Sequence, residues 1–392
     1  MIKVPGNVLL ALLVGSLALA QEPGARTLAT AVDRAIAEGH PEQAQKALVE
    51  LLELQHVELE VLLECGSKLA EGEHYEPARA VFARAAQEYP RNFEAHYNLA
   101  LTDVALRRFD EARTVLEAPV ELSKDQQFAR EYLRGKIYDA TGQPALAERS
   151  FTAALAGAPR EENYALDLGL FYLRQRQHAK ARETLEAGVR YHPESSYLLL
   201  GAALAQYLDN DPQGAAATCT RVLTREPRFG PAQVLLAVAH YTSGENEKCV
   251  KETAAMIARP GAPPYLHYLH AASLMKLNSK DYGAILGDLD QATHGMTDCG
   301  FCYLALSKVH QEMGNEQDAI ADLETLVQRV DPEFSNGWYR LANLYQHAGR
   351  SADAANALER FHAIKTAQTD REAEYLRTFF LTELGAEGSG KK

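Results

Sequence analysis

The sequence lacks the short motifs that mark the common enzyme classes. It contains no glycine loop that would cradle a phosphate, no GxSxG nucleophile motif and no HExxH zinc motif. Carboxylates are abundant, but two of them four residues apart on a helix are typical of a solvated surface. We therefore predict no catalytic residue, no cofactor and no enzymatic activity.

Basic clusters are also absent. The chain has 40 Lys and Arg against 53 Asp and Glu, a net charge of −13, and no local run of cations offsets this balance. Because a negative surface repels polyanions, the composition argues against a nucleic-acid or anionic-membrane partner. Beyond the first twenty residues, no segment approaches the roughly 20 apolar residues that a membrane span needs.

The first twenty residues are typical of a signal peptide. Lys3 supplies a charged start, Val8 to Ala20 form an apolar core, and Ala18 and Ala20 suit a cleavage site before Gln21. We expect an exported protein, periplasmic or extracellular, with no membrane span after cleavage. An uncleaved segment kept as an anchor is the alternative that the residues leave open.

The rest of the chain consists of variants of one unit, seen most clearly from Glu162 to Ser195. Its first half reads as an amphipathic helix with Leu166, Leu168, Leu170, Phe171 and Leu173, and its second half as a helix with Ala181, Leu185 and Val189. Pro193 closes the unit because it cannot continue a helix. Gly169 and Ala181 are small, as required where two helices of a hairpin cross closely.

Two series of small residues give the unit a period of 34 or 35 residues, which predicts a repeat architecture. The series in the first helix is Gly66, Ala100, Gly135, Gly169, Ala203, Ala237, Ala272, Ser307 and Ala342. The series in the second helix is Ala44, Ala78, Ala112, Ala147, Ala181, Ala215, Cys249, Ala284, Ala319 and Ala354. Closing prolines recur at Pro90, Pro159, Pro193 and Pro227, and Pro332 lies one residue off this register.

The pattern resembles the tetratricopeptide repeat (TPR). With the predicted signal peptide, the resemblance implies an exported member of the TPR protein family. In the unit from Glu162 the family's motif positions fall on Ala165, Leu168, Gly169, Tyr172, Ala181, Leu185, Gly188 and Pro193. The family's bulky first residue and its second alanine are replaced here by Ala165 and Gly188. The resemblance implies an all-α fold, a right-handed α-solenoid of about ten helix hairpins with a C-terminal capping helix.

We divide the chain into a signal peptide (1–20), a TPR solenoid (25–366), a capping helix (367–384) and a disordered tail (385–392). The expected repeats begin at Ala25, Leu59, Phe93, Phe128, Glu162, Ser196, Gly230, Tyr265, Gly300 and Ser335. Pro119 should shorten or kink the second helix of the third repeat. PGAPP at 260–264 is the one place where we expect a bend or a junction between two lobes. Phe379 and Phe380 should help to cover the end of the stack.

The five cysteines suggest a second hypothesis about function, based on thiol or metal chemistry. Cys65 and Cys249 fit inward positions of the repeat, and Cys219 and Cys249 lie on neighbouring second helices, where a bond is possible. Cys299 and Cys302 form a CxxC at the start of a predicted helix, which permits reduced thiols, a local disulfide or a redox role. His267 and His270 on the preceding repeat could join Cys299 and Cys302 as four metal ligands.

In the TPR family the first helices line a concave face that binds partners. By this resemblance the candidate binding groove comprises Leu166, Leu170, Tyr197, Leu200, Leu204, Tyr207, Val234, Val238, Tyr241, Tyr339, Arg340 and Asn343. If exposed, such a groove suits a helix or extended segment with large apolar anchors. The alternative is that its aliphatic members are inter-repeat core.

Two functions follow from these alternatives. The first is a non-catalytic adaptor or scaffold in the cell envelope or extracellular space that binds a protein or peptide segment in the groove. The second is a thiol-redox or metal-dependent accessory protein that uses the Cys299 and Cys302 corner. We favour the first, because the repeats offer a large docking surface and no enzyme motif accompanies the cysteines.

Overall fold

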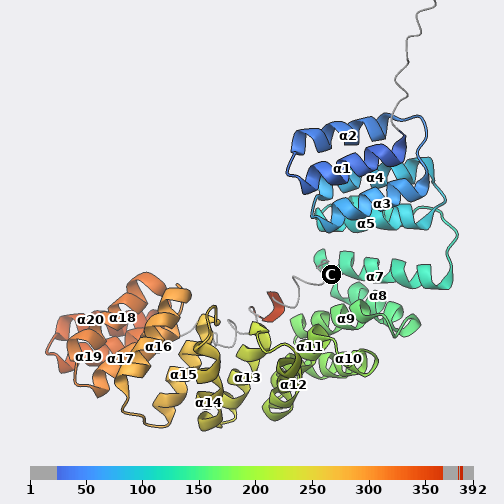
Figure 1. Cartoon of the computed structure of the whole chain (residues 1–392). Helices are drawn as coiled ribbons and strands as arrows, with labels where there is room; N and C mark the ends of the chain where they lie inside the picture. The colour runs from blue at the N-terminus through green and yellow to red at the C-terminus, as the bar shows by residue number, and fades with distance from the viewer. Residues whose placement is uncertain (1–23, 365–377, 379, 383–392) are drawn as a thin grey trace, which may run out of the picture. The chain divides into compact units, whose positions relative to one another are not determined.

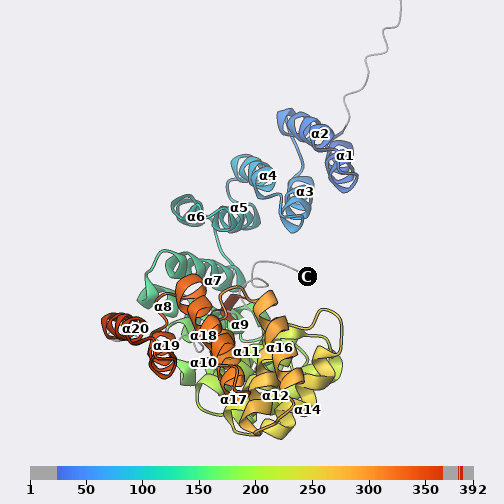
Figure 2. The same cartoon turned by 90° about the vertical axis from the view of Figure 1, so that its left-hand side faces the viewer.

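The chain folds into helix hairpins. The structure, a computed structural model, describes residues 24–364, 378 and 380–382, and within this part every regular element is helical and no strand occurs (Figures 1 and 2). No helix in these residues has the length and apolar character needed to cross a bilayer. The predicted signal peptide, tail and most of the predicted capping helix lie outside the described residues.

The structure divides the chain into two compact units, residues 1–121 and 122–392. The hairpins of unit 1 are α1 (Ala25–Ala37) with α2 (Pro41–Glu53), α3 (Leu59–Glu71) with α4 (Tyr75–Glu88), and α5 (Phe93–Ala105) with α6 (Phe109–Leu116).

Unit 2 continues with seven hairpins among its described residues. They are α7 (Lys124–Ala140) with α8 (Pro144–Gly157), α9 (Glu162–Arg174) with α10 (His178–Tyr191), α11 (Ser196–Leu208) with α12 (Pro212–Arg225), α13 (Gly230–Thr242) with α14 (Asn246–Ile257), α15 (Pro264–Lys276) with α16 (Tyr282–Gly295), α17 (Gly300–Glu312) with α18 (Glu316–Thr325) and its extension η1 (Leu326–Val330), and α19 (Ser335–His347) with α20 (Ser351–Ile364). The predicted α-solenoid of ten TPR hairpins is confirmed as a fold class.

Eight of the ten predicted repeat starts agree with the first residue of a helix, and α15 begins one residue early. The exception is α7, which begins at Lys124, four residues before the predicted Phe128. Its extra turn has a local cause. Ser123 Oγ accepts a hydrogen bond from the Gln126 amide at 3.2 Å, and Gln126 Oε1 accepts one from the Ser123 amide at 3.0 Å. This capping box starts the helix ahead of the repeat register.

The division between the units lies close to Pro119 and not at PGAPP. Helix α6 has only 8 residues and ends at Leu116, as the sequence predicted for a helix interrupted by proline. The proline-rich segment 260–264 instead connects α14 and α15 inside unit 2. Its prolines fall between two hairpins, where no helical hydrogen bond is lost, so the chain continues without a break between units.

Small residues set the packing within each hairpin. A Cβ atom added to Gly169 on α9 would overlap the side chain of Leu185 on α10. The equivalent pairs, Gly66 with Phe82 and Gly135 with Phe151, show the same close approach. The second-helix partner is each time the bulky residue four positions after the second-helix alanine. The predicted crossing point is therefore confirmed, and this contact fixes the register of the repeats.

Each hairpin turns through one residue with positive φ. The ten residues, from α1–α2 to α19–α20, are Gly39, Glu73, Arg107, Gly142, Arg176, Asn210, Gly244, Asn278, Gly314 and Gly349. Because the same conformation recurs in every hairpin of both units, it belongs to the hairpin itself. The left-handed region favours glycine and tolerates asparagine, so Glu73, Arg107 and Arg176 are strained there.

The offset of Pro332 also has a structural cause. The second helix of its hairpin ends in η1, one turn of π-helix. A π turn accommodates an extra residue in the helix. The chain therefore reaches its closing proline one residue later than in the other repeats, and the next helix still begins at the predicted Ser335.

The described residues of unit 2 form two separate hydrophobic clusters. The larger one, which we call the central cluster, extends from Tyr132 on α7 to Val309 on α17, and the smaller one joins α18, η1, α19 and α20. Phe380 is 1% exposed and belongs to the central cluster, not to that of the last hairpin. This is a different place from the end of the stack, where we expected Phe380.

Candidate functional site

The face of the first helices that the family uses for binding can be followed by register. We call the residue directly after each small first-helix residue the inner position. The inner positions are Ser67 and Leu101 in unit 1, and Lys136, Leu170, Leu204, Val238, Ser273, Lys308 and Asn343 in unit 2. Because the small residue contacts the second helix, the inner positions share one orientation relative to their hairpins.

The aliphatic members of the predicted groove are buried. Leu166, Leu170, Leu200, Leu204, Val234 and Val238 are at most 4% exposed and belong to the central cluster. In the folded chain these side chains are therefore core, which was the alternative prediction. Charged substitutions at Leu170 or Leu204 would place a carboxylate in an apolar interior, so their effect on a partner could not be separated from unfolding.

The predicted tyrosines between them are partly exposed. The rings of Tyr197 and Phe229 meet edge to face with centroids 5.7 Å apart. Lys276 Nζ lies 3.4 Å from the ring centroid of Tyr241, a cation–π contact between α15 and α13. Tyr207 packs partly buried against the central cluster. These three tyrosine rings are the part of the predicted central groove that retains contact with solvent.

Two first helices in this region are buried around their whole circumference. Every residue of 198–205 on α11 and of 232–240 on α13 is buried. Each stretch exceeds two helical turns, so side chains pointing in all directions are covered. In a single layer of hairpins, one face of a first helix would remain open. The face of α11 and α13 is therefore covered by further side chains.

The predicted residues of α19 behave differently. Tyr339, Arg340 and Asn343 follow one another at helical spacing and, with Asn336 of the same helix and Gln311 of α17, line a hollow of about 220 Å³. Tyr339 is 46% exposed, and its ring centroid lies 5.3 Å from that of Phe361. Amide groups, a phenol and a guanidinium together can hydrogen-bond a peptide backbone or a carboxylate. We call these four residues of α19 the α19 face.

Sequence reasoning missed a second hollow, of about 300 Å³, between α12, α13 and α14 of unit 2. Its lining residues are Thr220, Leu223, Thr224, Pro227, Gln233, Leu236, Glu252, Ala255, Met256 and Arg259. Arg259 Nη1 donates to the Pro227 carbonyl at 3.4 Å and holds α14 against the loop before α13. The lining residues belong to three helices and a loop, so no contiguous motif in the sequence marks this hollow.

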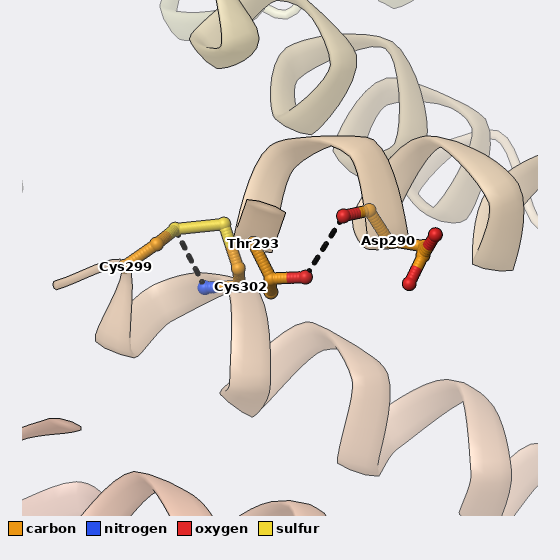
Figure 3. Close-up of a disulfide and its surroundings, with 4 residues drawn as sticks. All are labelled: Asp290, Thr293, Cys299 and Cys302. Atoms are coloured by element: carbon orange, nitrogen blue, oxygen red, sulfur yellow. Dashed lines mark hydrogen bonds between the residues drawn. A yellow bond between two sulfur atoms is a disulfide. The ribbon is translucent and has the colours of Figure 1, made fainter. Parts of the chain in front are cut away.

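Cys299 and Cys302 form a disulfide at the start of α17, beside the end of α16 that carries Thr293 (Figure 3). Both residues are at most 1% exposed. Cys299 Sγ also accepts a hydrogen bond from the Cys302 amide at 3.2 Å, as an N-cap. The local disulfide was one of the alternatives from the sequence, and burial keeps both sulfurs from solution thiols.

The four-ligand metal hypothesis is wrong. The two sulfurs are bonded to each other, and the two histidines contact Asp288, His267 Nδ1 at 2.8 Å and His270 Nδ1 at 2.5 Å. In the part of the chain that the structure covers, no three His, Cys, Asp or Glu side chains converge to hold a metal ion. With neither thiols nor ligands available, the redox or metal function has no support.

The other cysteines are free and buried. Burial raises the pKa of the Cys65 thiol to about 12 and also raises the pKa values of Cys219 and Cys249. The Cys249 thiol donates to the Ala237 carbonyl at 3.4 Å. No bond joins Cys219 to Cys249. These protonated thiols act as small apolar side chains, as expected for Cys65 and Cys249.

Polar contacts connect first and second helices beside the buried stretch. Tyr172 donates to Glu148 at 3.2 Å, and at the equivalent position Tyr345 donates to Glu324 at 2.6 Å. Histidine takes this position in α13, where His240 contacts Glu252 at 3.2 Å. The hydrogen bond to Glu252 is the main cause that raises the pKa of His240, and Glu245 contributes to the same shift.

Comparison with known proteins agrees with this architecture. Two family profiles described as tetratricopeptide repeat match residues 132–187, 166–231 and 304–365, and residues 69–136. Together these matches span more than half of the chain.

The curated relatives are more distant. The chain is 22% identical over 169 residues to "Tetratricopeptide repeat protein 6" of Homo sapiens, covering 42% of this chain and 32% of that protein. It is 24% identical over 305 residues to "BBSome complex member BBS4 homolog" of Drosophila melanogaster, covering 73% of this chain and 61% of that protein. The chain thus spans less than two thirds of either relative.

Among solved structures, the C-terminal part of a TPR repeat-containing protein from Cytophaga hutchinsonii aligns with a TM-score of 0.44 and 14% identity, covering 70% of this chain and 97% of that one. From the repeat profiles and the ten hairpins, the chain belongs to the tetratricopeptide repeat family.

Proposed function

We propose that this protein is a non-catalytic scaffold that binds a protein segment on the first-helix face of unit 2. The observation that carries the proposal is the α19 face, where Asn336, Tyr339, Arg340 and Asn343 line a hollow with Gln311. TPR repeats serve protein–protein interaction in general, and this is the stretch where predicted groove residues are both gathered and accessible.

The chemistry of the α19 face suits a polypeptide. Tyrosine and arginine are enriched among the residues that dominate binding energy at protein interfaces. Asn336 and Asn343 can each donate to and accept from a peptide group, as in strand or helix-end recognition. A single arginine offers one bidentate contact to a carboxylate. A partner segment with an acidic or C-terminal group beside an apolar residue would meet all of these side chains.

The location we propose is the cell envelope or the extracellular space. Two features support it, the signal-like segment Met1–Ala20 and the bonded pair Cys299 and Cys302, because disulfides persist in oxidising compartments. Mass spectrometry of the protein isolated from its own cells tests this. We expect a mature N-terminus at Gln21 and a Cys299–Cys302 bond. An intact Met1 together with two alkylatable thiols would contradict export.

Binding is tested by photo-crosslinking in the same cells. A photoreactive amino acid replaces Asn343 in the full chain, and in a control chain it replaces Leu146, an exposed residue of the second helix α8. We expect one discrete protein adduct from position 343 that is missing from position 146. Adducts of equal pattern at both positions, or at neither, would show that the α19 face is not the binding surface.

A further inference from the structure

The cover over the central first helices is not a property of the repeat. Leu101 at the inner position of α5 is 39% exposed. At the same position Leu170, Leu204 and Val238 are at most 2% exposed, while Lys308 and Asn343 further along are exposed again. Since the inner position keeps one orientation in every hairpin, the difference arises from the side chains that pack against these residues on α9, α11 and α13.

The C-terminal part of the chain contributes a side chain to the central cluster. Phe380 is 1% exposed and belongs to the central cluster, and Leu381 packs against the same cluster. Both views show the short red segment 380–382 beside α9 and α11, which lie far from it in the sequence (Figures 1 and 2). Thr378 and Thr382 are exposed, so this segment has a buried side and a solvent side.

We propose that the C-terminal segment around Phe380 is an internal ligand of the first-helix groove, and that a partner binds there by displacing it. The proposal rests on the proposed scaffold function and adds a second binding surface to the α19 face. The partner at this surface is a short amphipathic segment that inserts a large aromatic side chain into the central cluster, where Phe380 lies. The groove is closed in the resting chain and opens when the segment leaves.

The sequence of the segment fits this role. Thr369 to Leu384 carries Tyr375, Leu376, Phe379, Phe380 and Leu384 among charged residues. Such a pattern is that of helix-in-groove ligands, which place apolar anchors at spacings of three and four residues. It follows the last hairpin directly and is joined to it by the same chain. A tethered ligand competes at a high effective concentration, so a partner must bind the groove tightly to replace it.

The experiment measures binding of a fluorescein-labelled peptide with the sequence of residues 369–384 to full-length chains by fluorescence anisotropy. The chains are the unchanged protein, Phe380→Asp, and the control Leu358→Asp, which alters an exposed apolar residue of α20. A tethered segment at about 1 mM effective concentration weakens a peptide of about 10 μM Kd by about 100-fold. We therefore expect Phe380→Asp to bind the peptide about 100-fold more tightly than the other two chains.

A second full-length variant covers the case in which Phe380→Asp does not fold. It carries a specific protease sequence inserted after Ile364 and an affinity tag at the C-terminus. After cleavage under native conditions, at a protein concentration well above about 10 μM, the tagged fragment should retain the rest of the chain, and the labelled peptide in excess should release it. Separation of the two parts on cleavage alone would overturn the proposal.

Further outcomes are equally decisive. Equal peptide binding by the unchanged chain and Phe380→Asp would show that the segment does not block the groove. A concentration-dependent dimer of the unchanged chain that Phe380→Asp abolishes would place the segment in a second copy, and would overturn the internal ligand. Crosslinking at Asn343 reports on the scaffold function separately, so it can succeed where the internal ligand fails.

Discussion

Two stretches of unit 2 have the same repeat register but differ in the solvent exposure of their first helices. From α9 to α15 the inner positions Leu170, Leu204, Val238 and Ser273 are buried, whereas Lys308 on α17 and Asn343 on α19 are exposed. Both stretches use the same hairpin geometry, with a small first-helix residue against the second helix. The comparison shows that the repeat determines where a side chain points, while the rest of the chain determines whether solvent reaches it.

The largest expected effect comes from truncating an inner position in each stretch. Leu204→Ala should lower the free energy of unfolding by about 3 kcal/mol, because it removes buried methyl groups and leaves a cavity. Asn343→Ala should change it by less than about 0.5 kcal/mol, because the side chain is exposed. Urea unfolding followed by circular dichroism measures both. Equal losses would mean that the two stretches do not differ in cover.

The same unfolding measurement can identify which side chain buries Leu204. If Phe380 lies over Leu204, the cost of Leu204→Ala should fall by about 1 kcal/mol in a chain that already carries Phe380→Ala, since residues in contact are not additive. Asn343→Ala should cost the same with or without Phe380→Ala. Additive losses at Leu204 would indicate that neighbouring repeats alone bury this leucine.

The second prediction concerns the contact that keeps both stretches in register. Gly169→Ala should destabilise the protein by about 1–3 kcal/mol, because its Cβ would overlap Leu185 and the hairpin must open. Gly287 on α16 is the matched control, since a Cβ there would meet nothing within 4 Å. Gly287→Ala should stabilise by about 0.5–1 kcal/mol through helix propensity. Thermal unfolding of the two variants should therefore shift in opposite directions.

The sequence could predict the register but not the cover. Periodic small residues predict where the helices lie, because each small residue packs against a bulky residue about sixteen positions later, as Gly169 packs against Leu185. The start of α7 escaped prediction because its capping box at Ser123 and Gln126 lies outside the repeat pattern. PGAPP lies between two hairpins, where prolines cost no helical hydrogen bond, whereas the second helix before Pro119 ends early at Leu116.

The groove was the least predictable part. The sequence shows only that Leu204 is an apolar residue on a first helix, and this is the same whether solvent or packed side chains lie against it. Its burial depends on which side chains pack against it in the folded chain, and the repeat period does not encode that. By contrast, Tyr339, Arg340 and Asn343 line one hollow, because polar residues at helical spacing have few stable places other than an accessible face.

The third prediction is a pH dependence in the covered stretch. The pKa of His240 is raised above its usual value of 6.5, mainly by the hydrogen bond to Glu252. A raised histidine pKa contributes stability that is complete below pH 6.5 and is lost as the pH rises through the folded-state value. His240→Gln should therefore cost most in acid, about 1.5 kcal/mol on the scale of a charge-assisted hydrogen bond.

Unfolding of the unchanged protein and of His240→Gln at about pH 5.5 and about pH 8.5 tests this dependence. The control is His294→Gln, whose side chain is 75% exposed on α16 and whose loss should matter little at either pH. A cost of His240→Gln that grows toward high pH would contradict the assigned direction.

The smallest effects are expected in the hairpin turns, where the two stretches should agree. Gly349 in the α19–α20 turn has φ +74°, and Gly349→Ala should destabilise by about 1 kcal/mol because a Cβ is disfavoured in the left-handed region. Arg176 in the α9–α10 turn has φ +56°, so Arg176→Gly should stabilise by about 0.5 kcal/mol after the entropy cost of glycine is counted. Thermal unfolding of both variants measures the pair. Because these turns belong to the hairpin and not to its surroundings, neither effect should depend on Phe380. A change in either value in the Phe380→Ala chain would mean that the cover reaches beyond the inner positions.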